Sequence, residues 1–79
     1  MNIIRRLGIA PAQREQSCAV TNCPDLFELE NGDFAVIGFE QTVKLTAKLP
    51  SDAGCGPGES IVVIPREVLI QARQHIPAE

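Results

Sequence analysis

The sequence predicts a small α+β domain: a mixed three-stranded sheet and two helices in the order ββαβα, preceded by a flexible N-terminal arm. Three observations predict this class. They are an Asn-Gly turn between two apolar segments, a run of four β-branched residues, and two segments with helical spacing. A chain of 79 residues has room for one core, and we divide it into an arm, 1–22, and a domain, 23–79.

The arm lacks a sustained hydrophobic period and carries a polar stretch at 13–17, so we expect it to be mobile or docked on a partner. Two alternatives stay open for its apolar residues, a short helical turn or an added strand, and either is marginal alone. These residues are Ile3, Ile4, Leu7 and Ile9.

The clearest local signal is the Asn31-Gly32 dipeptide, which favours a two-residue type I′ hairpin turn between 26–30 and 33–37. A two-residue loop would set the register of the pairing. The expected pairs are Glu30 with Asp33, Leu29 with Phe34, Glu28 with Ala35, and Phe27 with Val36. One face of the hairpin should then be core, formed by Phe27, Leu29, Phe34 and Val36.

Residues 40–49 have helical spacing, with Glu40, Lys44 and Lys48 on one solvent face, and Pro50 ends the segment. The Glu40–Lys44 pair should add roughly 0.2–0.5 kcal/mol. A glycine- and proline-rich loop follows at 50–60.

The run 61–64 is continuously β-branched, which is typical of a strand covered on both faces. Because a helix precedes it, we expect it to run parallel to the second hairpin strand. Pro65 should open the last helix and Pro77 should close it. Its helically spaced apolar residues are Val68, Leu69, Ala72 and Ile76, with Ile70 off the stripe and exposed.

Charge and composition exclude several functions. The net charge is −3, with seven basic and ten acidic residues, which disfavours nucleic-acid binding. No stretch is apolar enough to span a membrane. Arg5 and Arg6 interrupt the N-terminal apolar residues, so the start is no signal peptide and we expect a cytoplasmic protein.

Four residues could hold zinc: Cys18, Cys23, Cys55 and His75. Structural zinc accepts three cysteines and one histidine, but the Cys-x4-Cys spacing is wide and the other two ligands are isolated. Free thiols and a surface histidine explain the same residues, and the first two cysteines are close enough to pair under oxidation. With one histidine and a shallow core, we expect no enzyme and no cofactor.

An acidic hairpin edge is the preferred interaction surface. Glu30 and Asp33 should face each other beside the turn, and such like charges repel. A basic protein surface would relieve that repulsion. The predicted partner-binding residues are Asp25, Glu28, Glu30 and Asp33.

The segments Cys23-Pro-Asp-Leu-Phe-Glu-Leu29, Gly32-Asp-Phe-Ala-Val-Ile-Gly38, Leu49-Pro50 and Ile61-Val-Val-Ile-Pro-Arg66 resemble a group of small acidic actinobacterial proteins of unknown function. The resemblance spans about residues 23–69. Members of the group often lie near helix-turn-helix regulators, so the resemblance implies an accessory or regulatory role, and it brings no known catalytic residues to this sequence.

Together these features predict a cytoplasmic regulatory or adaptor protein that acts through protein contacts. The alternative is a small zinc-binding or thiol-redox protein that uses its three cysteines. Because three short strands and two helices make a thin core, we also expect a tendency to form a homodimer.

Overall fold

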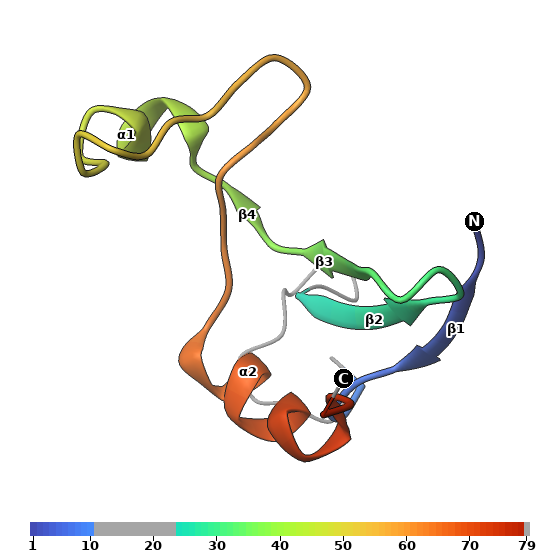
Figure 1. Ribbon diagram of the computed structural model, residues 1–79. Coiled ribbons are helices and arrows are strands. Elements are labelled where there is room, and N and C mark those ends of the chain that lie inside the picture. Colours follow the sequence, from blue (N-terminus) through green and yellow to red (C-terminus); the bar gives the residue numbers. More distant parts are fainter. Residues whose placement is uncertain (11–23, 79) are drawn as a thin grey trace.

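The computed structural model describes residues 1–10 and 24–78, and it is an α+β fold as predicted (Figure 1). A three-stranded antiparallel sheet has the order β1-β2-β3, and a separate two-stranded sheet pairs β4 with β5. The elements are β1 (Ile3–Arg6), β2 (Asp25–Leu29), β3 (Phe34–Ile37), β4 (Phe39–Glu40), α1 (Thr42–Thr46), β5 (Val62–Val63) and α2 (Arg66–Ala72), with a 3₁₀ turn at Arg73–His75.

Over residues 1–10 the expectation of a mobile arm is corrected, and of the two alternatives the added strand is the one that forms. β1 pairs antiparallel with β2, and the chain after it continues into the core, where Leu7 is buried. The Leu7 N–H donates to the carbonyl of Leu26 at 2.9 Å. Residues 11–22 of the predicted arm lie outside the described residues.

The predicted sheet topology is wrong for the last strand, because β5 pairs antiparallel with β4 and does not join the main sheet. Figure 1 shows why: the chain leaves the sheet at β4, turns through α1 and the 50–60 loop, and passes beside β4 before it runs on to α2. A parallel crossover needs an element that packs back across the sheet. Helix α1 has five residues and none of them is buried, so it does not provide that crossover.

The hairpin register differs from the prediction by one residue, with Glu28 opposite Phe34 and Phe27 opposite Ala35. The reason lies in the turn, where only Gly32 has a positive φ, of 93°. Asn31 instead accepts a hydrogen bond through Oδ1 from the Asp33 N–H at 3.0 Å. The connection therefore spans three residues, which is the next commonest hairpin loop.

This one-residue difference reassigns the faces of the sheet. Side chains directly opposite each other share a face, and neighbours along a strand alternate. Phe34 and Val36 therefore lie on the face of Leu26, whereas Phe27 lies on the opposite face. The predicted core face of four residues from both strands does not form.

The core formed by the described residues gathers where β2 meets α2. Its buried apolar side chains are Leu7, Leu26, Val68 and Ala72, with Ile64 packed against them. The helical stripe is confirmed at Val68 and Ala72, and the expected exposure of Ile70 is also confirmed. Leu69 and Ile76 were expected in that stripe but are exposed.

Two further predictions are wrong in the ribbon formed by β4 and β5. Glu40 lies in β4, not in a helix, so the predicted Glu40–Lys44 pair on one helical face does not form. The run 61–64 contributes only Val62 and Val63 to a strand, and both are exposed because no helix folds back over them. At Gly38, where the ribbon begins, an added Cβ would lie only 2.8 Å from the Val63 carbonyl oxygen.

The ribbon is joined to α1 by a polar chain of contacts. The Glu40 carboxylate accepts a hydrogen bond from the Thr42 N–H at 2.6 Å, and the Thr42 hydroxyl accepts one from the Ile61 N–H at 2.8 Å. The hydrogen bonds from Thr42 lower the pKa of the Glu40 carboxyl below its ordinary value. The ionised form of Glu40 therefore favours the folded ribbon.

We expect the Thr42 amide to lose protection from hydrogen exchange in acid. A carboxyl whose pKa is lowered by folding contributes stability above its unfolded pKa, and the contribution is lost as pH falls through its folded pKa. The measurement is the hydrogen-exchange rate of the Thr42 amide at a series of pH values between about pH 5 and pH 2, divided by the intrinsic rate at each pH. The Glu40→Gln variant should show no such step, and an equal step in that variant would contradict the assignment.

Candidate functional site

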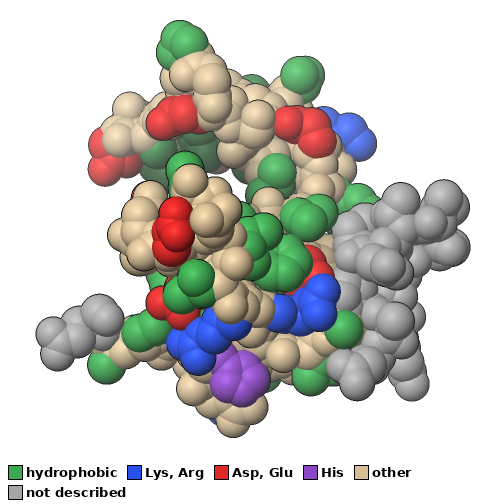
Figure 2. All heavy atoms as spheres, turned by 90° about the vertical axis from the view of Figure 1, so that its right-hand side faces the viewer, with side chains coloured by type: hydrophobic (Ala, Val, Ile, Leu, Met, Phe, Trp, Pro, Cys, Tyr) green, Lys and Arg blue, Asp and Glu red, His purple; other side chains and the backbone are tan. Residues whose placement is uncertain are grey.

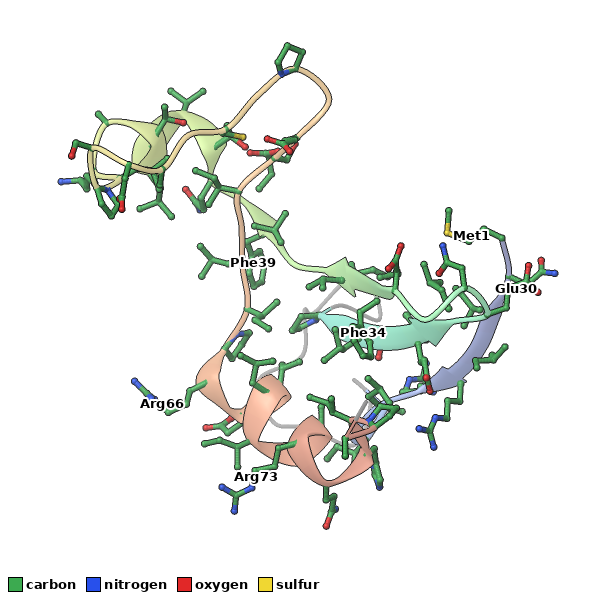
Figure 3. The ribbon with its side chains drawn as sticks, viewed as in Figure 1. Met1, Glu30, Phe34, Phe39, Arg66 and Arg73 are labelled. Carbon is green, nitrogen blue, oxygen red and sulfur yellow. The ribbon has the colours of Figure 1, made fainter. Side chains whose placement is uncertain are left out.

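The acidic hairpin does not stand free, because β1 brings basic groups across from it. Arg5 Nε lies 2.8 Å from Glu28 Oε1, and Arg6 Nη2 lies 2.9 Å from Asp25 Oδ2. The N-terminal ammonium lies 3.6 Å from Glu30 Oε1, and Figure 3 shows Met1 beside Glu30 at the turn end of the sheet. Acidic and arginine side chains accordingly alternate on this side of the molecule (Figure 2).

Asp25 is a buried structural residue, with 2% of its surface exposed. Its two carboxylate oxygens each accept a hydrogen bond from Arg6 Nε at 3.0 Å, and Oδ1 also accepts one from the Leu26 N–H at 2.9 Å. The same contact raises the pKa of Arg6 above its ordinary value, so the arginine stays charged. Of the four residues predicted to bind a partner, Asp25 is thus not at the surface.

The observed register also removes the repulsion on which the acidic-edge hypothesis depended. Asp33 lies across from Leu29, whose N–H donates to the Asp33 carbonyl at 2.9 Å, and not across from Glu30. The Asp33 carboxylate accepts a hydrogen bond from Asn31 Nδ2 at 3.2 Å. The edge at Glu28, Glu30 and Asp33 stays a prediction, but most of its charge is balanced within the chain.

His75 holds the C-terminal turn against β1 and the residues that follow it. Its Nδ1 accepts a hydrogen bond from the Gly8 N–H at 2.9 Å, and its carbonyl accepts one from Arg5 Nη2 at 3.0 Å. Figure 2 shows the histidine directly beside arginine side chains. With Nδ1 occupied by a backbone donor, a metal could be bound only through Nε2.

The four predicted zinc ligands are not brought together in the described part of the chain. Cys55 is a free, half-buried thiol in the loop beyond α1, and Figure 1 places that loop and the turn of His75 at opposite ends of the molecule. Cys18 and Cys23 lie outside the described residues. Within 1–10 and 24–78, no three histidine, cysteine or acidic side chains form a group that could hold a metal ion.

The outer face of α2 is a surface that the sequence analysis missed. Leu69 and Ile70 are 52% and 48% exposed, and Arg66 and Arg73 lie one turn to either side of them. Figure 3 shows Arg66 at the start of α2 and Arg73 just after its end, both extending away from the sheet. Neither forms an ion pair with any residue in the described ranges.

The sequence contains a spacing pattern that indicates this exposed face of the last helix. Positions 66, 69, 70 and 73 follow the i, i+3, i+4, i+7 pattern of one helix face. The helical spacing of Val68, Leu69, Ala72 and Ile76 predicts a single buried stripe, and for Leu69 that prediction is wrong. Only the packing of Val68 and Ala72 on β2 shows which side of the helix faces solvent.

A shallow, open pocket lies at the start of α1, lined by five consecutive residues, 40–44. Since one chain segment supplies the whole lining, the pocket brings together no nucleophile and base from separate elements. No helix in the described residues has the length and apolarity needed to cross a membrane.

Comparisons with known proteins add no assignment. No protein-family model matches the chain, no curated protein matches it, and no solved structure matches its fold. The resemblance to small actinobacterial proteins therefore stays a prediction. A functional proposal has to be built on the surfaces described above.

Proposed function

We propose that this protein is a non-enzymatic interaction module with a regulatory or adaptor role in the cytoplasm, and that it contacts a protein partner through the α2 face. This face is defined by Arg66, Leu69, Ile70 and Arg73. The observation that supports it is a pair of half-exposed aliphatic side chains, Leu69 and Ile70, between two arginines that form no ion pair with residues 1–10 or 24–78.

Energetic considerations favour this face over the acidic hairpin. Covering the exposed halves of Leu69 and Ile70 would contribute on the order of 1 kcal/mol each. The two arginines suit a partner that carries carboxylates, because arginine forms bidentate pairs with them and is enriched among residues that dominate interfaces. The partner we propose is therefore an acidic segment with apolar residues. By contrast, Asp25 and Glu28 are already paired with arginines of β1, and Glu30 lies beside the N-terminal ammonium.

The test is quantitative binding of the partner identified by cross-linking and mass spectrometry in the source cells. Charge reversal in the Arg66→Glu/Arg73→Glu variant should weaken the partner's affinity at least tenfold, which corresponds to about 1.4 kcal/mol. The matched control is Val43→Ser, which removes an exposed aliphatic side chain on α1. Equal affinities of the wild-type protein and the double variant would overturn the proposal.

The alternative, a zinc or thiol-redox protein, has no supporting observation in the described residues. Native mass spectrometry of the gently purified protein tests it directly. A mass raised by one zinc ion, lost in a triple Cys→Ser variant, would favour the alternative over an interaction module.

A further inference from the structure

We propose that the outer edge of β3 pairs with the same edge of a second copy of this chain, joining two three-stranded sheets into one six-stranded antiparallel sheet. The inference goes beyond the proposed function and uses a different surface, since it does not involve the α2 face. It rests on the backbone geometry of β3 and on the exposed side chains of that strand.

The backbone of β3 has unused hydrogen-bonding groups along one side. β3 is an edge strand, and the contact between the Leu29 N–H and the Asp33 carbonyl shows that residue 33 faces β2. Because backbone groups alternate in direction along an antiparallel strand, those of Ala35 and Ile37 also face β2. The groups of Phe34 and Val36 therefore point outward, and in the described residues no hydrogen bond involves them on that side.

Among the described residues, the β3 edge carries no charge, proline or bulge of the kind that protects sheet edges from pairing. The opposite edge strand, β1, carries Arg5 and Arg6 and an irregular register, all of which discourage addition of another strand. The sequence of β3 is Phe-Ala-Val-Ile, with no charge, no proline and no bulge. Three of its four side chains are more than 40% exposed: Phe34, Val36 and Ile37.

A second copy fits this edge better than an arbitrary strand because the edge is self-complementary. A two-fold axis at Ala35 sets Phe34 opposite Val36 of the partner subunit, and the outward groups of both residues then form four hydrogen bonds across the axis. Aromatic and β-branched side chains are a favourable cross-strand pair. In this register Asp33 lies opposite Ile37 of the partner subunit, so no like charges face each other.

The dimer would also cover apolar side chains that the single chain leaves in water. Ile37 at the end of β3 and Phe39, which follows it in β4, are each 46% exposed. Figure 3 shows Phe34 and Phe39 at the two ends of the exposed apolar stretch that runs from β3 into β4.

The test is the mass of the purified full chain, measured by light scattering after size exclusion over a range of concentrations. We expect twice the 8.5 kDa of one chain at high concentration. The Val36→Pro substitution replaces the outward N–H with a ring carbon. An edge strand tolerates proline where the missing N–H faces outward, so the single chain should still fold, but the dissociation constant of the dimer should rise at least a hundredfold. Val36→Thr keeps that N–H and the β-branched shape, and it should stay dimeric.

Two further measurements keep the test decisive. If Val36→Pro does not fold, Phe34→Lys places a charge on the same edge and should give a folded monomer. In the wild type, hydrogen exchange of the Phe34 and Val36 amides should slow as the protein concentration rises.

A wild type that is monomeric at every concentration, or a dimer that persists in both edge variants, overturns the inference. The Arg66→Glu/Arg73→Glu variant should stay dimeric, which separates this result from the test of the α2 face.

Discussion

Replacing Leu7 with alanine is expected to lower the free energy of unfolding by about 2 to 5 kcal/mol. Leu7 is 2% exposed and is one of four buried apolar side chains in the described core, so its removal leaves a cavity that few neighbours can fill. A domain of this length has a total stability of roughly 4 to 12 kcal/mol. The variant should therefore lose a large share of the stability of the domain and unfold at a much lower urea concentration than the wild type.

Urea unfolding followed by circular dichroism measures this effect, because its midpoint shifts with stability. The matched control is Ile4→Ala, which removes a similar side chain from β1 where it is exposed, and it should cost less than about 1 kcal/mol. Equal midpoints for the two variants would show that residues 1–10 do not belong to the folded core.

Replacing Arg6 with methionine should cost about 2 to 4 kcal/mol, the second of the two largest expected effects. The Asp25 carboxylate is buried, and without Arg6 the described residues leave it only the hydrogen bond from the Leu26 N–H. A buried carboxylate without a cationic partner is costly, because its charge is removed from water and is not compensated. The ring of Phe27, 5.3 Å below the guanidinium, would also lose its cationic neighbour.

A double-mutant cycle identifies the buried charge as the cause. Adding Asp25→Asn to Arg6→Met removes the charge and should recover part of the lost stability. Glu30→Gln is the control, since the contact of Glu30 with the N-terminus is exposed and such pairs contribute about 0 to 1 kcal/mol. If the double variant is as unstable as Arg6→Met, the loss comes from packing of the arginine side chain and not from its charge.

The parts of the fold that the sequence predicts correctly are those with local signals. The hairpin between 26 and 37 follows from Asn31-Gly32 flanked by apolar residues, and the last helix follows from Pro65 and the spacing of Val68 and Ala72. The α+β class follows from the same periodicities. Turn chemistry and hydrophobic spacing act over a few residues, so they can be read without knowing what lies across the sheet.

The hairpin register was less accessible to sequence reasoning because two loop types compete at the same dipeptide. An Asn-Gly pair fits a two-residue type I′ turn, but Asn31 is held by its hydrogen bond with the Asp33 N–H, and Gly32 alone takes the positive φ. A shift of one residue moves every side chain of a strand to the other face. The predicted apolar face was therefore lost although both strands were correctly located.

The candidate surfaces depended still more on distant contacts. Nothing near Asp25 in the sequence indicates that Arg6, nineteen positions earlier, covers it, and this pairing turns a predicted docking residue into a buried one. The exposed edge of β3 exists because the last strand pairs with β4 and not with the main sheet. Local propensities define the segments of this protein, whereas strand order and charge pairing are long-range, so they decide which side chains are left at the surface for a partner.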